Sequence, residues 1–276
     1  MGKSVLFHHL TGRRVVVSNY PGSTVEVTRG RTRLGGQIFE VVDTPGMYSL
    51  VPISEEERVA RRILLQGDVA AIVQVVDAKN LERMLPLTLQ LLELGLPLVL
   101  CLNVMDEAEQ LGISIDTEGL ARELGVPVVK TVAIWRRGVR GLRRAVEAEL
   151  ARGGTRPENA APLKYEEPIE AAVEAVTSRL PGVLVSRGRA VTLLLLQRGE
   201  EVRDLLERLD PVARAVVDEE VHKARGALRR APAFLIARRR QERCADLAAR
   251  YVTLPEVSAA TRTWSDRMSA LTERPI

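Results

Sequence analysis

The fold is decided by the stretch Pro97-Leu98-Val99-Leu100-Cys101-Leu102-Asn103-Val104-Met105-Asp106, an apolar run followed by two polar side chains three positions apart. The apolar run predicts a strand that is buried on both faces, as in the middle of a parallel sheet. Polar residues that follow such a strand lie at the sheet edge where α/β domains bind their ligands. The Asn-x-x-Asp spacing favours a guanine-reading loop, because the Asp106 carboxylate can accept hydrogen bonds from N1 and N2 of guanine while Asn103 tethers the loop. Adenine offers no such pair of donors. The alternative interpretation of the Asn-x-x-Asp segment is an ordinary polar turn after a strand.

The rest of the first half of the chain alternates β-rich runs with helical patterns. This alternation indicates an α/β domain with a mostly parallel sheet and helices on both faces. The predicted strands are Thr24–Leu34, Gln37–Val42, Val69–Val76, Pro97–Leu102 and Val126–Thr131. The predicted helices are Lys3–Thr11, Glu55–Gln66, Met84–Leu94, Thr117–Leu124 and Val139–Ala151.

The second half of the chain has a helical pattern almost to its end. We predict an α/β domain over residues 1–152, a linker over 153–165 that is rich in Gly, Pro and polar residues, and a small all-α bundle over 166–272. The predicted helices of the bundle are Glu167–Ser178, Arg189–Arg198, Glu200–Leu209, Pro211–Arg230, Ala233–Tyr251 and Pro255–Leu271.

Two further motifs belong to a phosphate site. Gly2-Lys3-Ser4, followed by a helical pattern, matches the end of a P-loop, in which the lysine reaches the β- and γ-phosphates and the hydroxyl binds Mg²⁺. Asp43-Thr44-Pro45-Gly46 follows a predicted strand, so Asp43 can hold Mg²⁺ through water and the Gly46 N–H can contact a γ-phosphate. Thr24 lies between them, where a nucleotide-sensing loop would place an Mg²⁺-binding threonine. Each motif is weak alone, but their order predicts a guanine-nucleotide site.

The composition excludes several other classes of protein. A chain of 276 residues with 46% hydrophobic and 28% charged residues is globular, and 3% aromatic residues predict an aliphatic core. Two cysteines (Cys101 and Cys244, both in apolar stretches and predicted to be buried) and three histidines argue against a disulfide framework or a Cys- or His-based metal centre. The net charge of +4 comes from arginines interleaved with acids and gives little support to nucleic-acid binding. No apolar run reaches the ~18 residues of a membrane span, so we expect a soluble, intracellular chain.

Taken together, these residues resemble the N-terminal cytosolic region of FeoB-type ferrous iron transport proteins. The helical half resembles the family's nucleotide-dissociation-inhibitor-like (GDI-like) domain. The stretches that carry the resemblance are Ser18-Asn19-Tyr20-Pro21-Gly22-Ser23-Thr24-Val25-Glu26, Asp43-Thr44-Pro45-Gly46-Met47-Tyr48-Ser49-Leu50, Ser54-Glu55-Glu56-Glu57-Arg58-Val59-Ala60, Val75-Val76-Asp77-Ala78-Lys79-Asn80-Leu81-Glu82-Arg83, Leu87-Thr88-Leu89-Gln90-Leu91-Leu92-Glu93-Leu94-Gly95 and Ala237-Arg238-Arg239-Arg240-Gln241-Glu242-Arg243-Cys244.

The resemblance implies a GTPase module that binds GTP or GDP with Mg²⁺, and K⁺ in the complete protein. The nucleotide-binding positions it implies are Gly2, Lys3, Ser4, Val5, Thr24, Asp43, Gly46, Asn103, Met105, Asp106, Ala133 and Ile134. The implied Mg²⁺ ligands are Ser4, Thr24 and Asp43. No catalytic residue is assigned, because Met47 stands where many small GTPases carry a water-orienting Gln, and hydrolysis is expected to be slow. Trp135, beside the guanine-side loop, either covers the base edge or caps the strand end, and packing is the favoured interpretation.

The resemblance also implies a partner. This is a membrane-embedded Fe²⁺ permease, fused downstream or separate, which would place the chain at the inner face of the plasma membrane. The implied function is to couple the nucleotide state of the switch loops to that permease. A homo-oligomer is left open, and no nucleic acid is expected.

The beginning of the chain departs from the family pattern. The family's loop reads Gly-Asn-Pro-Asn-Val/Ala-Gly-Lys-Ser/Thr, and this sequence begins at its fifth position with Met1. The strand before the loop would be central in the sheet, so we expect its absence to leave backbone groups of neighbouring strands unpaired. We therefore expect the native start to lie upstream, and mass spectrometry that finds Met1 or Gly2 at the native N-terminus would refute this.

Two alternative functions remain at this level. A ribosome- or RNA-associated GTPase would suit the basic charge, although the helical half has no GxxG loop and few stacking aromatics. A non-nucleotide-binding interaction module would follow if the incomplete P-loop cannot hold phosphate.

Overall fold

The computed structural model describes residues 2–12, 15–153, 163–180, 182–198, 206 and 211–255. The elements of the first half, in chain order, are α1 (Lys3–Thr11), β1 (Val15–Asn19), β2 (Glu26–Leu34), β3 (Gln37–Asp43), α2 (Glu55–Gln66), β4 (Ile72–Asp77), α3 (Leu81–Glu93), β5 (Leu98–Asn103), α4 (Met105–Gln110), β6 (Ser114–Ile115), α5 (Thr117–Leu124), β7 (Val128–Lys130) and α6 (Val139–Arg152). Those of the second half are α7 (Glu167–Thr177), α8 (Gly188–Arg198), α9 (Pro211–Ala227), α10 (Pro232–Tyr251) and β8 (Val252–Thr253). Short 3-10 turns lie at Ala78–Asn80 (η1), Ala133–Trp135 (η2) and Gly182–Arg187 (η3).

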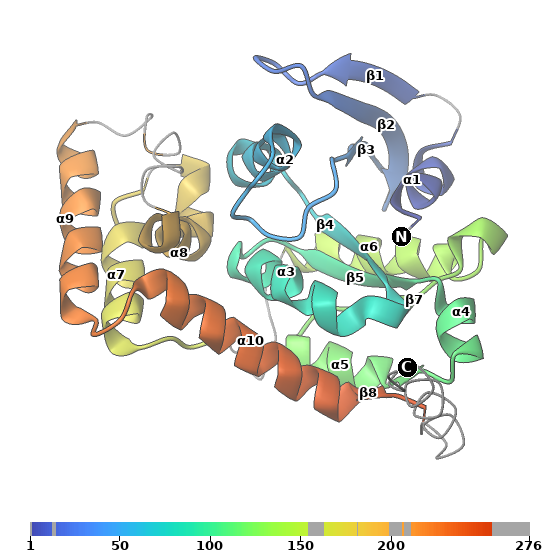
Figure 1. The fold of residues 1–276 in the computed structure, drawn as a ribbon. Coiled ribbons are helices and arrows are strands. Elements are labelled where there is room, and N and C mark those ends of the chain that lie inside the picture. Colours follow the sequence, from blue (N-terminus) through green and yellow to red (C-terminus); the bar gives the residue numbers. More distant parts are fainter. Residues whose placement is uncertain are drawn as a thin grey trace, which may run out of the picture.

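Strand β5 is buried on both faces, as its apolar run predicts. Leu98, Leu100 and Leu102 point into a core shared with α3 and α5, whereas Val99 and Cys101 point into a second core with α1 and α6. All five side chains are fully buried. The strand therefore has helices on either side, and Figure 1 shows α3 and α6 on opposite sides of it.

The strands form two separate main sheets. β4, β5 and β7 are parallel, whereas β1, β2 and β3 form an antiparallel sheet. The β2–β3 hairpin follows from the two-residue turn Gly35-Gly36, in which both φ angles are positive (53° and 84°), as such tight hairpin turns require. Among the described residues no strand joins β3 to β4, so the predicted parallel sheet is found only in β4, β5 and β7. Strand β1 was not predicted, because Val15-Val16-Val17 is too short a run to stand out.

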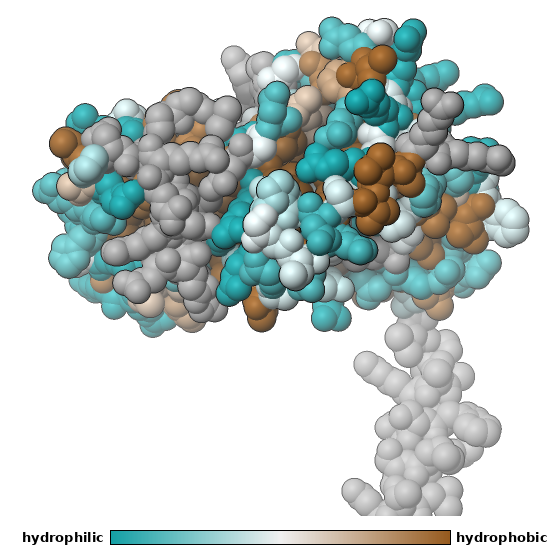
Figure 2. All heavy atoms as spheres, turned by 90° about the horizontal axis from the view of Figure 1, so that it is seen from above, coloured by the Kyte–Doolittle hydropathy of each residue, from teal (hydrophilic) through white to brown (hydrophobic). Residues whose placement is uncertain are grey.

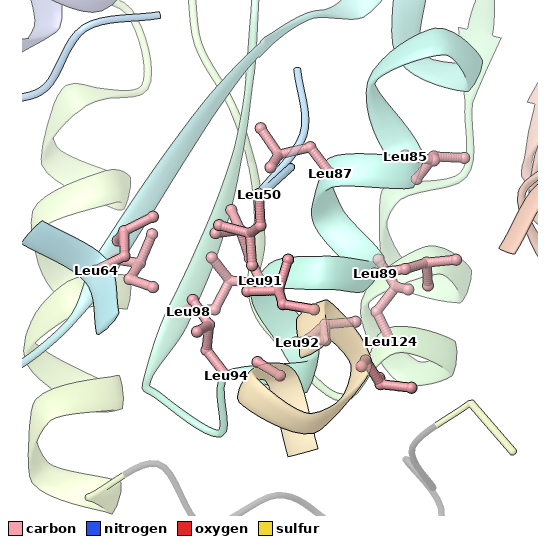
Figure 3. Close-up of a cluster of buried hydrophobic side chains, with 14 of the residues drawn as sticks. Leu50, Leu64, Leu85, Leu87, Leu89, Leu91, Leu92, Leu94, Leu98 and Leu124 are labelled. Atoms are coloured by element: carbon pink, nitrogen blue, oxygen red, sulfur yellow. The ribbon is translucent and has the colours of Figure 1, made fainter. Parts of the chain in front are cut away.

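The loop after β3 packs against the larger core. Figure 3 shows Leu50, which follows the Asp43-Thr44-Pro45-Gly46 motif, beside Leu87 and Leu91 of α3. The structure also buries all ten leucines labelled there to 8% exposure or less. Leu50 anchors a loop whose earlier residues, Gly46 and Tyr48, are exposed. Val59 of α2 packs against Val27 of β2 and against Val25, which directly precedes that strand.

Local signals placed several helices correctly. Helices α1, α2 and α5 begin and end at the predicted residues. The Ser54 hydroxyl accepts a hydrogen bond from the Glu57 N–H at 3.3 Å, and Asp116 accepts one from the Gly119 N–H at 2.9 Å, so both are N-caps. Helix α3 begins three residues before the predicted Met84 and keeps Pro86 in its first turns.

The second half is helical, as predicted. α7, α8 and α9 pack together, and α10 runs back along α3 and α5 of the first half (Figure 1). The predicted helices Glu200–Leu209 and Pro255–Leu271 fall outside the described residues except for Leu206 and Pro255, as does most of the predicted linker 153–165. In the described part of the chain, none of the helices combines the length and the apolar character that crossing a membrane requires.

In Figure 2, which looks down on the molecule from the top of Figure 1, the antiparallel sheet is the part nearest the viewer. Figure 2 shows hydrophobic side chains scattered there among hydrophilic ones. Three apolar side chains of this sheet are more than half exposed: Val16 (64%), Val17 (55%) and Ile38 (65%). The antiparallel sheet is thus less completely covered than the parallel one.

Both cysteines are buried and free, as predicted. Burial raises the pKa of the Cys101 thiol to about 11, and burial also raises the pKa of Cys244. Since the thiolate is the reactive form, we expect both thiols to react with Ellman's reagent at least about 100-fold more slowly in the native protein than in urea at pH 8. Fast reaction of either thiol in the native protein would contradict this burial.

Candidate functional site

The phosphate motifs meet at the N-terminus of α1. The Lys3 ammonium lies 2.6 Å from Asp43 Oδ1 and also donates to the Thr44 carbonyl, while the Ser4 hydroxyl donates to Asp43 Oδ2 at 3.0 Å. These contacts join residues about 40 positions apart, at the end of β3 and the start of α1. The first turn of α1 contains no acidic residue, and no side chain caps its N-terminus, so its N–H groups suit an anion.

The residues present fit a magnesium ion. The Ser4 hydroxyl and the Asp43 carboxylate offer the hard oxygen ligands that Mg²⁺ prefers, and they already lie within hydrogen-bond distance of each other. Thr24, the third predicted ligand, is exposed in the loop between β1 and β2 and makes none of these contacts. Within the described residues, no three His, Cys, Asp or Glu side chains gather as a separate metal site.

The loops that follow β5 and β7 are held together by Asn103, and these are the loops predicted to face guanine. Its Oδ1 accepts hydrogen bonds from the Thr131 hydroxyl and the Ala133 N–H, both at 2.9 Å. Asn103 is 2% exposed, and its side chain thereby fixes the loop after β7 against the end of β5. This arrangement is the tether that the Asn-x-x-Asp spacing predicts.

The phosphate motifs (Lys3, Ser4 and Asp43) and the loop that follows β7 lie next to each other at Gly2. A Cβ atom on Gly2, whose φ is +74°, would lie 2.4 Å from Asn103 Nδ2 and 3.7 Å from the Ala133 Cβ. His9 also bridges the two sides, because its Nε2 lies 2.9 Å from the Ala133 carbonyl oxygen. No motif in the sequence singles out His9, and only the tertiary contact identifies it.

In the segment that follows Asn103, one side chain is buried in the core and the next is partly accessible to solvent. Met105 is 4% exposed and packs in the larger core, so its contribution to a nucleotide site is limited to its backbone. Asp106 is half-buried one residue later. Val104 has φ +61°, a left-handed conformation that a β-branched residue rarely adopts, and strain of this kind is concentrated at functional sites. No sequence signal pointed to Val104.

The remaining predicted residues differ in their exposure. Gly46 is exposed, Val5 is 37% exposed, and Met47 is half-buried against the larger core. Ala133 is buried, whereas Ile134 and Trp135 are each 69% exposed. The expectation that Trp135 packs against the strand end is therefore wrong: Arg136, in the left-handed region at φ +57°, turns the chain outward there.

Gly2 provides a direct test of how close the two sides are. We expect Gly2→Ala to weaken nucleotide binding about tenfold or more, because its Cβ would push Asn103 out of the tether. Gly22→Ala is the matched control, since Gly22 has a similar φ of +77° but nothing within 4 Å of its added Cβ. The measurement is the Kd for a fluorescent GDP analogue; equal effects of the two substitutions would mean that backbone strain alone is responsible.

Three sequence motifs meet at one end of the α/β domain. A Gly-Lys-Ser turn at a helix N-terminus, an Asp-x-x-Gly loop and a tethered Asn-x-x-Asp loop lie in an α/β domain that a helical region follows. This combination is that of a P-loop GTP-binding domain.

Comparison with known proteins identifies the family. The family model described as ferrous iron transport protein B matches residues 1–146. The solved cytosolic domain of L. pneumophila FeoB is similar with a TM-score of 0.75 and 29% identity, covering 91% of this chain and 95% of that one. A GDP-bound mutant of S. thermophilus NFeoB gives the same values, and the GMPPNP form of the T. maritima FeoB cytosolic domain gives a TM-score of 0.70, 29% identity and coverages of 91% and 95%. The chain belongs to the FeoB family of ferrous iron transport proteins.

The curated relatives are much longer than this chain. The Fe(2+) transporter FeoB of Escherichia coli K12 is 36% identical over 203 residues, which is 72% of this chain and 26% of the relative. That of Salmonella typhimurium LT2 is 44% identical over 154 residues, or 54% of this chain and 20% of the relative. The chain thus spans about a quarter of the length of the relatives it matches.

Proposed function

We propose that this chain binds GTP and GDP, hydrolyses GTP slowly, and serves as the nucleotide-responsive module of a prokaryotic Fe²⁺ transporter. The observation that carries the proposal is the cluster of Lys3, Ser4 and Asp43 beside the tethered Asn103. Solved relatives with GDP and GMPPNP support the nucleotide class. The curated relatives, which are Fe(2+) transporters, support the process and a membrane permease as the partner.

The proposed roles follow from the chemistry of each side chain. Lys3 would leave Asp43 and bind the phosphates, while Ser4 and Asp43 would hold Mg²⁺. When bound, this ion would offset the negative charge of the phosphates. Asp106 would accept from guanine N1 and N2, and the backbone at Ala133 and Ile134 would face guanine O6. Thr24 and Gly46 would close on a γ-phosphate. Met47 offers a thioether where an amide would orient water, so hydrolysis would be slow.

Nucleotide titration tests this proposal. A fluorescent GDP analogue is titrated into the 276-residue chain with Mg²⁺, and unlabelled GTP, GDP and ATP are added as competitors. We expect GTP and GDP to compete and ATP not to compete. Failure to bind any guanine nucleotide would favour the non-nucleotide-binding interaction module, and salt-sensitive retention of RNA would favour the RNA-associated alternative.

We also propose that residues 1–152 act as the GTPase domain and residues 166–272 as a GDI-like domain that senses the nucleotide state. Contacts from the loop after Gly46 to α3 support this coupling. The Leu50 N–H and the Ser49 hydroxyl donate to Gln90 Oε1 at 2.8 and 3.1 Å. On the same helix, Glu93 accepts from Arg240 Nη2 of α10 at 2.5 Å. The loop between β3 and α2 (residues 44–54), which is called the switch loop below, therefore contacts α3 at Gln90. The helical region contacts the same helix at Glu93, three residues further on.

A second contact joins the helical region to α2. Arg187, in η3, is 3% exposed and donates to the carbonyl oxygens of Leu65 and Gly67 at 2.8 and 3.0 Å. These carbonyls lie at the C-terminal end of α2, the helix that follows the switch loop. A change in that loop would thus reach the helical region by two routes, through α3 and through α2.

Hydrogen exchange in the GDP- and GTP-analogue-bound states tests the coupling. We expect nucleotide-dependent protection of the Thr24 and Gly46 loops and of α10, and we expect Gln90→Leu to remove the change in α10 alone. Gln110→Leu, on the exposed end of α4, is the control. An unchanged α10 response in Gln90→Leu would exclude α3 as the route.

A further inference from the structure

An exposed tip, Ala133–Trp135, precedes α6, and the proposed GTPase function uses its backbone but gives no role to the side chains of Ile134 and Trp135. Ile134 and Trp135 at this tip are adjacent in the chain and each 69% exposed, and neighbouring exposed apolar side chains are typical of interaction sites. The tip is held in shape by the Val132–Arg137 bridge, by the Trp135 N–H donating to the Val132 carbonyl at 3.1 Å, and by the Asn103 tether to Ala133. The two side chains are therefore displayed on fixed backbone.

The tip is surrounded by positive charge. From Leu124 to Val146 the sequence contains six cations and no acid. Arg143 uses its guanidinium to hold the Leu10 and Arg33 carbonyls and the Thr32 hydroxyl. The other five cations are exposed and, in the part of the chain that the structure describes, make no ion pair: Lys130, Arg136, Arg137, Arg140 and Arg144.

We propose that residues 130–144 dock on an anionic phospholipid surface. Arginines and lysines would meet the headgroup phosphates, Trp135 would lie at the headgroup level, and Ile134 would enter the acyl boundary. On α10, by contrast, Arg238 and Arg239 both pair with Glu242.

A lipid surface suits this tip better than a nucleic acid does. Binding of single-stranded RNA relies on several aromatic platforms, whereas one exposed tryptophan stands here. The neighbouring Ile134 cannot stack on a base but gains from leaving water at a bilayer. The chain's family consists of iron transport proteins, and its curated relatives are Fe(2+) transporters, so a bilayer would be the nearby anionic surface.

Vesicle co-sedimentation of the 276-residue chain, without nucleotide, tests the proposal. We expect binding to vesicles of equal parts phosphatidylglycerol and phosphatidylcholine, weakened by salt, and none to phosphatidylcholine alone. Each cation near an anionic bilayer is worth about fivefold in partitioning, so Arg137→Gln with Arg140→Gln should lose roughly 25-fold. Arg229→Gln with Arg230→Gln, an exposed pair at the α9–α10 corner, lowers the net charge equally and should lose little.

The apolar contact has its own control and readout. Trp135→Ser should lower partitioning several-fold, whereas Phe234→Ser, which removes another half-exposed aromatic ring, should not. In a Trp264→Phe background Trp135 is the single tryptophan, and its fluorescence should shift to the blue on anionic vesicles. Equal losses in the two double variants, equal binding to both vesicles, or retention on a single-stranded RNA oligonucleotide in preference to the anionic vesicles would overturn the proposal.

Discussion

Asp106→Asn should weaken GDP binding by about 100-fold or more and shift the preference of the site toward xanthosine diphosphate. The carboxylate of Asp106 can accept hydrogen bonds from both N1–H and N2–H of guanine, whereas an asparagine amide turns one acceptor into a donor that faces the guanine amino group. A charge-assisted pair is worth about 3 kcal/mol, and a donor left facing a donor adds to the loss. Xanthine carries a carbonyl oxygen at C2, which accepts from the asparagine N–H, so the same substitution should improve its binding.

The measurement is competition against a fluorescent GDP analogue by GDP and by xanthosine diphosphate. Glu107→Gln is the matched control, because it removes one negative charge from the next position, where Glu107 pairs with Lys79 on the surface. We expect this control to change the Kd for GDP less than threefold, since an exposed ion pair contributes little. If Asp106→Asn weakened both diphosphates equally, Asp106 would not be reading the base.

Arg240→Met should destabilise the protein by about 3–5 kcal/mol, because it leaves the Glu93 carboxylate buried without its partner. The side chains of Arg240 and Glu93 are only 8% and 3% exposed, and their atoms lie 2.5 Å apart. Arg240 Nε also donates to the Tyr165 hydroxyl at 3.0 Å, and Tyr165 in turn donates to Glu93. Removing the guanidinium thus breaks a closed network that joins α3, α10 and the segment before α7.

The pKa values of Arg240 and Tyr165 determine how the stability contributed by this network depends on pH. Burial alone would lower the pKa of Arg240, but the Glu93 charge and the Tyr165 oxygen outweigh it and raise the pKa. Burial and the Glu93 charge raise the pKa of the Tyr165 hydroxyl above its ordinary value of 10.0. A raised pKa in the folded state contributes stability that is complete below pH 10 and declines as the pH rises above it. The loss in Arg240→Met should therefore be present throughout the neutral range.

Urea unfolding at pH 7 measures the effect, and the double variant Glu93→Leu with Arg240→Met separates its causes. Because the double variant leaves no buried charge unpaired, we expect it to recover much of the loss. Arg29→Met provides the surface comparison: its partner Glu40 is half-exposed, and the cost should stay below about 1 kcal/mol. A double variant as unstable as Arg240→Met would show that packing, rather than unpaired charge, sets the cost.

Elements that depend on local chemistry could be predicted from the order of residues along the chain. The apolar run Leu98–Leu102 required burial on both faces, and the structure places alternate side chains of β5 in two different cores. Ser54 and Asp116 placed two helix starts, because a side-chain oxygen satisfies N–H groups that the helix leaves unpaired. The spacing of the phosphate and guanine motifs also predicted a common site, and the structure brings Lys3, Ser4 and Asp43 into contact; their roles toward a nucleotide stay predictions.

Contacts between residues far apart in the chain could not be predicted in this way. Local patterns carry no information on the partner of a buried charge, so Glu93 and Arg240, 147 positions apart, could not be paired in advance. The same holds for the contact of His9 with Ala133, for the burial of Met105 and for the outward turn that exposes Trp135, each of which depends on how loops close over separate strands. The division of the strands into an antiparallel and a parallel sheet was likewise a tertiary outcome, because strand order depends on which hydrogen-bonding edges find partners in space.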